Sequence, residues 1–321
     1  MVILGIESTA HTFGIGIVTD KGKILANVKD SYTSKDVGMI PHEIAEHHEK
    51  IAERILKEAF KAAKVEWKDI DLLAYSAGPG LDPVLWSGYN IVKAWADKYD
   101  LKLAGVNHCC AHLSIGKLWN KLKDPVYLYV SGVNTQIIVQ EQKKKGEGKY
   151  YVLGETLDIG LGNMLDKFGR MPGLGFPAGP KIEKLAKKGK YIELPYIVKG
   201  MDVSFSGLLT KAQQLWERQQ ASKEDLCFSL QETAFAMCTE VAERALAHSG
   251  KKELLLVGGV GANKRFCEML DLMCKERGAK FYQVPMELAG DQGAMIAWEG
   301  FLRKDSYGDI EVNPHWRADE I

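Results

Sequence analysis

The chain has 321 residues, of which 46% are hydrophobic and 26% are charged, a composition typical of globular proteins with enough length for two domains. Its 42 basic residues balance its 42 acidic residues, so any binding of nucleic acid must come from a local basic patch or from a partner protein. No hydrophobic run reaches the roughly 20 residues that a membrane-spanning helix needs.

The N-terminus lacks the basic region and the cleavage site of a signal peptide. None of the six cysteines forms a C-x-x-C pair, which favours small core residues in a reducing compartment over a disulfide framework. We therefore expect a cytoplasmic protein that does not bind a membrane.

Three strands joined by short polar turns are expected at the start of the chain, over residues 2–7, 13–19 and 24–28. Helices and strands then alternate, at residues 41–62, 72–76, 87–99, 103–106 and 108–117. This alternation is typical of layered α/β folds.

The opening pattern repeats in the middle of the chain. A strand over 126–130, the turn Ser131-Gly132-Val133-Asn134-Thr135 and strands over 136–140 and 151–153 repeat its order and its turn chemistry. The remaining expected elements are helices over 159–170, 179–188, 223–248 and 289–302 and a strand over 253–257. The repeat indicates two halves of similar topology, whose small turn residues would let backbone N–H groups approach a phosphate.

His108 and His112 form the sharpest candidate for a metal site. Residues four apart share one face of a helix, and two imidazoles on one face can bind one metal ion. The pair follows an expected buried strand, where ligands collect in α/β folds. The spacing fits two ordinary half-buried histidines equally well. A zinc-protease pattern would need a glutamate in place of Cys109, so we interpret Cys109 and Cys110 as core residues.

A second cluster, His42-Glu43-Ile44-Ala45-Glu46-His47-His48, also has the composition of a metal site. A charged, solvated helix face produces the same string, and we favour that interpretation.

Several acidic residues lie near expected turns or on helices. Asp291 lies in a glycine turn before a helix, so it is either an N-cap, which is the commoner role, or a metal ligand. The glycine turn over 258–263 would let the chain pass close to a base or a ribose, although its pattern is not G-x-G-x-x-G. Asp158, Asp166 and Glu183 lie on or near the helices after the second hairpin and could each be surface acids.

Two basic runs could contact the phosphates of a nucleic acid, residues 143–145 with Lys149, and Lys184 with Lys187, Lys188 and Lys190. Solvated turns are the commoner explanation for such runs.

Ten segments resemble, in order, the universal tRNA threonylcarbamoyladenosine synthases, the TsaD family. The chain is most similar to the archaeal and eukaryotic branch, which supplies the catalytic subunit of the KEOPS complex. Among the segments are Ile-Glu-Ser-Thr-Ala-His-Thr at 6–12 and Asn-His-Cys-Cys-Ala-His at 107–112. The others are residues 45–48, 128–136, 154–163, 199–209, 229–236, 257–263, 290–297 and 314–320, so the resemblance covers nearly the whole chain.

The resemblance implies a two-lobed α/β fold of the actin-like/sugar-kinase/Hsp70 (ASKHA) class, built from duplicated RNase H-like domains. The expected N-terminal lobe covers residues 1–125 and is completed by a C-terminal helix over 297–321. The C-terminal lobe, over 126–296, would carry the metal and nucleotide contacts.

The resemblance also implies an activity. The threonylcarbamoyl group of threonylcarbamoyl-AMP would pass to N6 of the adenosine 3′ of the anticodon, in tRNAs reading codons that begin with A, and AMP would leave. ATP or threonylcarbamoyl-AMP would be the nucleotide ligand. The implied partners are tRNA and the KEOPS subunits, including a small protein kinase/ATPase and a dimerising subunit.

Matching motif positions assign one divalent metal per subunit to four ligands, His108, His112, Tyr129 and Asp291. We favour iron (Fe2+) over Zn2+, because phenolate is a hard oxygen ligand. The metal would act as a Lewis acid, and no catalytic nucleophile is assigned. The residues assigned to substrate and nucleotide binding are Tyr129, Val130, Ser131, Gly132, Val133, Asp166, Gly179, Glu183 and Asn263.

The chain departs from the family pattern at three places. Val133 replaces the second glycine of Ser-Gly-Gly-Asn, and it would be strained if that position needs a positive φ. Ala178 replaces the first glycine of Pro-Gly-Gly-Pro, and no arginine follows Leu85. These departures bear on substrate affinity and rate more than on metal binding.

Two alternatives stay open. One is a non-catalytic or weakened scaffold subunit of the same complex. The other is a small-molecule kinase of the ASKHA fold, which would need a catalytic carboxylate. The first hairpin offers only Glu7 for that role, and the histidine pair would be unexplained.

Overall fold

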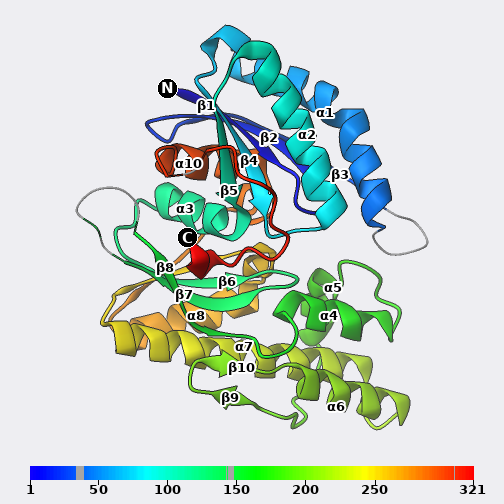
Figure 1. Ribbon diagram of the computed structural model, residues 1–321. Helices are drawn as coiled ribbons and strands as arrows, with labels where there is room; N and C mark the ends of the chain where they lie inside the picture. The colour runs from blue at the N-terminus through cyan, green and yellow to red at the C-terminus, as the bar shows by residue number, and fades with distance from the viewer. Residues whose placement is uncertain (34–39, 142, 144–147, 307) are drawn as a thin grey trace. The chain divides into compact units, whose positions relative to one another are not determined.

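The computed structural model describes residues 1–33, 40–141, 143, 148–306 and 308–321 (Figure 1). It separates into two compact units. The first unit contains Met1–Leu118, Gly290–Ile321 and the described residues between 142 and 149, and the second contains Trp119–Glu141 and Tyr150–Ala289. Lys144 and Lys145 of the first basic run lie outside the described residues.

A five-stranded sheet with the order β3-β2-β1-β4-β5 organises the first unit. β1, β2 and β3 form an antiparallel meander, whereas β4 and β5 run parallel to β1. The strands are β1 (Val2–Glu7), β2 (Thr12–Thr19), β3 (Ile24–Ser31), β4 (Leu72–Gly78) and β5 (Leu103–Asn107). The carboxyl ends of β1, β4 and β5 therefore meet at one edge, where ligands bind in open α/β sheets.

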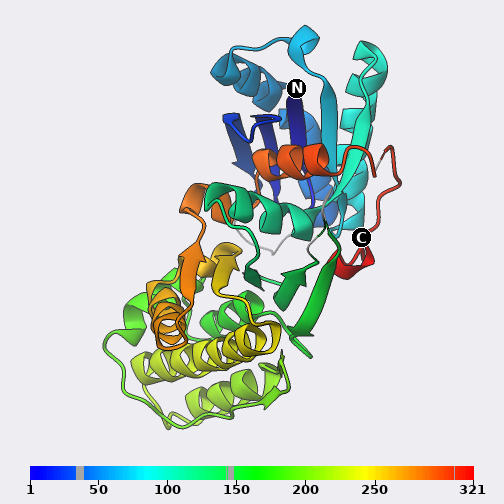
Figure 2. The same ribbon diagram turned by 90° about the vertical axis from the view of Figure 1, so that its left-hand side faces the viewer.

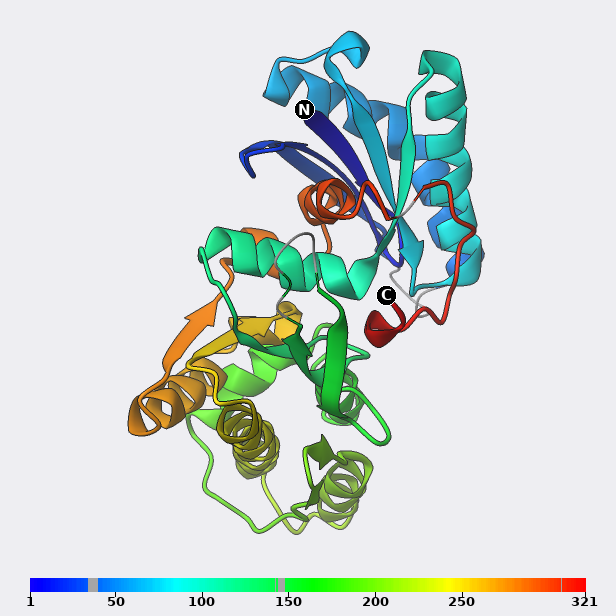
Figure 3. The same cartoon turned by 60° about the vertical axis from the view of Figure 1, so that its left-hand side comes forward.

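Helices cover both faces of this sheet. Leu4 and Ile6 of β1 pack into a hydrophobic core with α1 and α2. Gly5 and Gly16 face the other way, where a Cβ would lie 2.1 and 2.0 Å from backbone atoms of α10. Figures 2 and 3 show α10 crossing the strands on the side away from α1 and α2. The helices of this unit are α1 (Pro41–Ala63), α2 (Asp82–Tyr99), α3 (His108–Trp119) and α10 (Gly293–Leu302), with short turns η1 (Trp67–Asp69) and η3 (Ala318–Glu320).

The sheet of the second unit has the order β8-β7-β6-β11-β12. β6, β7 and β8 form an antiparallel meander, and β11 and β12 run parallel to β6, so order and direction repeat those of the first sheet. The strands are β6 (Val126–Val130), β7 (Thr135–Gln140), β8 (Tyr150–Glu155), β11 (Glu253–Val257) and β12 (Lys280–Gln283). The duplication predicted from the repeated turn chemistry is confirmed.

The core of the second unit forms around α7, whose buried residues pack with those of the sheet and its neighbouring helices. Ser222 caps the start of α7 by accepting a hydrogen bond from the backbone N–H of Asp225. The helices are α4 (Leu161–Arg170), α5 (Gly179–Ala186), α6 (Ser206–Glu217), α7 (Lys223–Ser249), α8 (Lys264–Glu276) and α9 (Met286–Ala289), with η2 (Gly259–Ala262) and a ribbon of β9 (Val198–Lys199) and β10 (Asp202–Val203).

Some elements differ from the sequence-based expectation. The helix expected over 297–321 is wrong, because α10 ends at Leu302 and only η3 follows it. The expected helix over 289–302 is divided into α9 and α10 by residues 290–292. α2 begins five residues earlier than expected, because Pro83 fits the first turn of a helix. α6, α8 and β12 were not expected from the sequence at all.

In the described part of the chain, no helix combines the length and the hydrophobicity that crossing a membrane requires.

Candidate functional site

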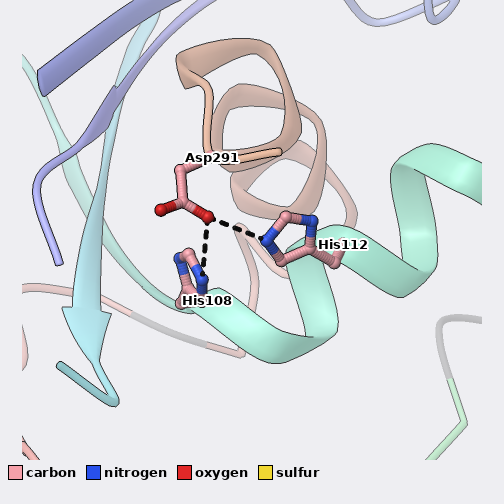
Figure 4. A group of neighbouring side chains, drawn as sticks. All are labelled: His108, His112 and Asp291. Atoms are coloured by element: carbon pink, nitrogen blue, oxygen red, sulfur yellow. Dashed lines mark hydrogen bonds and ion pairs between the residues drawn. The ribbon is translucent and has the colours of Figure 1, made fainter. Parts of the chain in front are cut away.

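His108, His112 and Asp291 come together in the first unit (Figure 4). Both histidines lie on the first turns of α3, which starts directly after β5. Asn107 fixes that start, because its Oδ1 accepts the backbone N–H of Cys110 at 3.1 Å, the geometry of an N-cap. The side chains therefore point from the carboxyl end of a parallel strand toward Asp291.

The geometry of this cluster fits one metal ion. The Nε2 atoms of His108 and His112 lie 3.6 and 3.3 Å from Oδ1 of Asp291. With metal–ligand bonds of about 2.0–2.2 Å, tetrahedral ligands lie roughly 3.4 Å apart. Within the described ranges, this is the only group of three such side chains that could hold a metal.

Asp291 is not the N-cap of α10. That role belongs to Gln292, whose side chain accepts the backbone N–H of Met295 at 3.1 Å. Lys29 of β3 holds the turn from the other side, because its ammonium donates to the carbonyl of Asp291 at 3.0 Å. The Asp291 carboxylate is thus left to face the histidines. The sequence-based expectation placed the metal contacts in a lobe over residues 126–296, whereas all three residues belong to the first unit.

A buried carboxylate supports the cluster from behind. Nδ1 of His108 lies 2.9 Å from Oε2 of Glu7, the last residue of β1, whose side chain is fully buried. An ionised carboxylate only accepts hydrogen bonds, so Nδ1 carries the proton and Nε2 faces Asp291. Thr9 donates its hydroxyl and its backbone N–H to the other oxygen of Glu7. Such outer contacts orient histidine ligands in metal sites.

The charges of the cluster follow from these contacts. Burial opposes a charged imidazole, but the carboxylates of Glu7 and Asp291 outweigh it and raise the pKa of His108 to about 9. Burial and the neighbouring His108 lower the pKa of His112. Burial also opposes ionisation of Asp291, yet its hydrogen bond to His112 and the charge of His108 lower its pKa. His112 is therefore neutral and Asp291 ionised, the states in which both bind metals.

Tyr129 and Val130 end β6 in the second unit, and both are buried. Tyr129 pairs with Gln136 of β7 and with Val257 of β11. The role of Tyr129 as a metal ligand stays a prediction.

The turn from Ser131 to Asn134 joins β6 and β7. The backbone N–H of Ser131 donates to the carbonyl of Asn134 at 2.8 Å, and the N–H of Asn134 donates to the Ser131 hydroxyl at 3.0 Å. Val133 has a negative φ and is 69% exposed, so the strain considered for this position is absent. The N–H groups of Gly132 and Val133 have no hydrogen-bond partner among the described residues.

Helix α4 connects this turn to Asp166, the first of the acidic residues assigned to nucleotide binding. The N–H groups of Gly162 and Asn163 donate to the carbonyls of Ser131 and Gly132, at 3.1 and 2.9 Å. One turn further along α4, Asp166 accepts the backbone N–H of Ala178 at 2.7 Å, at the start of α5. Burial raises the pKa of Asp166.

The remaining assigned residues continue the same series of contacts. Ala178 has ordinary helical backbone angles, so this position does not require a glycine. α5 begins at the neighbouring Gly179. Glu183 on α5 accepts the backbone N–H of Lys264 at 3.0 Å, and Asn263 caps α8 through the N–H of Phe266. The residues assigned to the nucleotide thus lie on connected elements of one unit.

The histidine-rich segment of α1 behaves mostly as a solvated face, with His42, Glu43 and Glu46 exposed. His48 is the exception, because it is fully buried and its Nδ1 lies 3.2 Å from the hydroxyl of Ser8. Burial lowers the pKa of His48 to about 4. Cys109 and Cys110 are buried, as expected for core residues, and none of the six cysteines forms a disulfide.

Sequence reasoning missed the contribution of Glu7 to the histidine cluster. The residue lies 101 positions from His108, and the sequence pattern indicates only a carboxylate that a kinase of this fold would need. One signal could have found it. Glu7 ends β1, which runs parallel to β4 and lies two strands from β5, so its side chain emerges at the same edge of the sheet as His108.

Solved structures show the same fold. HypF from T. kodakarensis matches with a TM-score of 0.66 and 17% identity, over 95% of this chain and 48% of HypF. The (R)-2-hydroxyglutaryl-CoA dehydratase component A of Acidaminococcus fermentans matches with a TM-score of 0.56 and 12% identity, over 95% of this chain and all of that one. With the duplicated sheets, these matches confirm the expected α/β fold of the ASKHA class.

Sequence comparison identifies the family. A model of the TsaD family, described as tRNA N6-adenosine threonylcarbamoyltransferase, matches residues 23–298. Proteins of that name from Thermococcus sibiricus and Thermococcus kodakarensis are 54% and 52% identical over 328 residues, covering 100% of this chain and 99% and 98% of theirs. A Methanosarcina mazei protein named probable bifunctional tRNA threonylcarbamoyladenosine biosynthesis protein is 50% identical, and this chain covers 58% of it. The chain belongs to the TsaD family of tRNA N6-adenosine threonylcarbamoyltransferases.

Proposed function

We propose that this protein transfers the threonylcarbamoyl group of threonylcarbamoyl-AMP to N6 of the adenosine 3′ of the anticodon, in tRNAs that read codons beginning with A. The observation that carries the proposal is the convergence of His108, His112 and Asp291 in a member of this family. In the reaction, a bond forms from N6 to the carbamoyl carbon while the bond from that carbon to the phosphate oxygen breaks. AMP leaves, and the amine loses a proton.

The cluster is proposed to hold one divalent metal per subunit, and Tyr129 is proposed as a fourth ligand. Two imidazole nitrogens and a carboxylate oxygen at the spacing described above support this assignment. When bound, the metal supplies Lewis acidity toward the threonyl or carbamoyl oxygens. Fe2+ is favoured over Zn2+, because the set includes two oxygen ligands, one of them a phenolate. Glu7 would keep Nε2 of His108 aimed at the ligand position.

The second unit is proposed to bind the nucleotide. Asp166 and Glu183 each accept one main-chain N–H, and a carboxylate has a second oxygen that can accept a ribose hydroxyl. The N–H groups of Gly132 and Val133, which have no partner in the described part of the chain, can donate to phosphate, as in other anion-binding turns. A Cβ added at Gly179 meets no protein atom within 4 Å, which leaves space for a ligand beside α5.

The reaction is proposed to take place in the cytoplasm with partner proteins. Because the chain has no net charge, we expect other KEOPS subunits to help hold the tRNA, among them a small protein kinase/ATPase and a dimerising subunit. The bifunctional name of the longer relative supports a second protein activity acting alongside this one.

Reconstitution tests the activity. The chain, its KEOPS partners, unmodified tRNA and threonylcarbamoyl-AMP should yield threonylcarbamoyl-adenosine, measured by mass spectrometry of digested tRNA. His112→Ala should lose the metal in element-specific analysis and lower the rate by more than about 100-fold, since changes to outer contacts alone cost about 10–100-fold. His42→Ala, which changes an exposed histidine of α1, is the matched control. No product from an intact wild-type complex would refute the activity, and undiminished metal in His112→Ala would refute the metal site.

A second variant tests the nucleotide assignment separately. Gly179→Ala should raise the KM for threonylcarbamoyl-AMP without changing the melting temperature, because the added methyl meets only the ligand. Gly207→Ala on α6 is the control, since its Cβ would make an ordinary van der Waals contact at 3.5 Å with the side chain of Ile197. An unchanged KM in Gly179→Ala would remove Gly179 from the nucleotide site.

A further inference from the structure

The segment from Lys167 to Lys190 is strongly basic in a chain whose formal charge is zero. It contains seven basic residues and one acidic residue, a net charge of +6. All seven basic side chains are exposed on α4, on α5 or in the segments that adjoin α5: Lys167, Arg170, Lys181, Lys184, Lys187, Lys188 and Lys190. We call this set the basic α4–α5 surface.

Helix geometry keeps these charges on the solvent side. On α5, Ile182 and Ala186 are buried against the core around α7. Lys181, Lys184 and Lys188 follow a spacing of three and four residues, so they share the opposite side of the helix and its C-terminal continuation. On α4, Lys167 and Arg170 are likewise three apart. The basic side chains of each helix therefore form a continuous stripe on its exposed side.

None of the seven cations forms an ion pair with a described carboxylate. The neighbouring carboxylates instead accept hydrogen bonds from main-chain N–H groups, Asp166 from Ala178, Glu183 from Lys264 and Asp225 from Lys190. Elsewhere on the same unit, arginines do pair with acids, as Arg265 with Glu232 and Arg277 with Glu243. Arg170 and Lys190 act electrostatically on Asp166 and Asp225, so the positive charge left for a ligand is chiefly that of the other lysines on α4, on α5 and directly after it.

Aromatic side chains accompany the charge. Phe176, in the loop between α4 and α5, is 62% exposed, and Tyr191, directly after Lys190, is 58% exposed. The ammonium of Lys181 donates to the carbonyl of Leu174, which places a positive charge beside the loop that carries Phe176. Unpaired cations with exposed aromatic rings are the combination that binds single-stranded nucleic acid, through phosphates and base stacking.

The surface also adjoins the residues proposed to bind the nucleotide. The first turn of α4 holds the Ser131–Asn134 turn, and the start of α5 is fixed by Asp166. An RNA strand lying on α4 and α5 would therefore pass close to the proposed donor of the transferred group.

We propose that the basic α4–α5 surface receives the sugar–phosphate backbone of the tRNA anticodon arm, with Phe176 stacking on an unpaired base of the loop. This inference rests on the proposed function, because it takes tRNA as the substrate. The anticodon loop is single-stranded, and its bases are open to stacking on aromatic side chains.

A charge-removal variant tests the phosphate contacts. Lys184→Gln, Lys187→Gln and Lys188→Gln combined should weaken binding of the full chain to tRNA by at least about tenfold at low salt. The slope of log affinity against log salt should fall by about 2 to 3, since each phosphate contact contributes about 0.7–0.9. The control combines Lys57→Gln, Lys61→Gln and Lys102→Gln, three exposed lysines of the first unit that form no ion pair with any described residue. Equal affinities and slopes for the two triple variants would overturn the proposal.

A second pair of variants tests stacking. Phe176→Leu should weaken binding of a single-stranded anticodon-loop RNA by about fivefold or more, because stacking of one base on an aromatic ring is lost. Tyr151→Leu, an exposed aromatic of β8, is the control and should bind like wild type. Unchanged affinity in Phe176→Leu would remove the stacking contact.

Separate measurements keep this inference distinct from the proposed function. If wild type binds tRNA and the lysine variant does not, but neither transfers the threonylcarbamoyl group in the complete complex, the activity fails and the surface stands. If the lysine variant keeps its tRNA affinity but no longer assembles with the KEOPS proteins, the surface docks a protein and the inference is overturned.

Discussion

The first hairpin turns of the two sheets occupy equivalent positions and have different environments. Residues 8–11 join β1 to β2, and residues 131–134 join β6 to β7. In the first turn, Ser8 and Thr9 are buried, and their N–H groups donate to the Ser76 hydroxyl and to the Glu7 carboxylate. The first turn is thus tied by buried side chains to the histidine cluster.

The second turn is held mainly by its own backbone and by α4. Its N–H groups at Gly132 and Val133 are free among the described residues, and Val133 is mostly exposed. Buried polar groups must be satisfied inside the protein, whereas exposed N–H groups remain available to a ligand. The same strand order therefore supports a fixed, ligand-orienting turn in one unit and an open, donor-presenting turn in the other.

The largest loss of stability is expected from a substitution beside the buried turn between β1 and β2. Glu7→Gln removes the charge that faces His108, and we expect a loss of roughly 3 kcal/mol in the free energy of unfolding, the lower end for breaking a buried ion pair. Metal affinity should fall by about 10–100-fold, because an outer carboxylate no longer orients the histidine. Urea denaturation and metal titration measure the two effects. Glu46→Gln, an exposed acid of α1, is the control, and an equal response of both variants would contradict a special role for Glu7.

His48 supplies a pH test of the same turn, through its contact with Ser8. Its pKa is about 4 in the folded state and 6.5 when unfolded, so between these values only the unfolded chain binds the proton. Stability should therefore fall as the pH drops below 6.5, by about 2–3 kcal/mol at pH 4.5.

Denaturation of wild type and His48→Gln at pH 7.5 and 4.5 isolates this contribution. The stability difference between them should shift in favour of the glutamine variant at the lower pH. His42→Gln, on the exposed face of α1, is the control variant. If the His48→Gln difference is the same at both pH values, His48 does not titrate as described.

Gly160→Ala tests the support of the open turn. A Cβ at this position would lie 2.2 and 2.4 Å from the carbonyl oxygens of Val133 and Gly132, so the turn or α4 must move. We expect a cost of about 1–3 kcal/mol, as for other overpacked sites, together with a higher KM for threonylcarbamoyl-AMP. Thermal melting and steady-state kinetics measure both. A fully stable variant with an unchanged KM would show that this contact does not position the turn.

The smallest effect is expected for Val133→Gly. Because Val133 has a negative φ and is exposed, the change should alter the free energy of unfolding by no more than about 0.5–1 kcal/mol. A large gain in stability would mean that valine is strained at this position after all. Transfer activity that appears only in the glycine variant would favour a weakened scaffold over the proposed enzyme.

Local patterns in the sequence were enough to predict most of the fold. The alternation of strands and helices and the repeated hairpins were correct, because apolar periodicity and turn residues act over a few positions. α6, α8 and β12 were missed, and the C-terminal helix was placed too late and made too long. Their sequences carry weaker periodic signals, and packing on the sheet decides where such elements begin and end.

The sequence by itself determined the spacing of His108 and His112, since four residues always return to one helix face. It could not decide whether they were ordinary buried histidines, because that depends on what faces them. Only the tertiary structure brought Asp291 to their Nε2 atoms and Glu7 to Nδ1 of His108, across 179 and 101 positions of the chain. Long-range partners follow from strand order and helix packing, which no local spacing encodes.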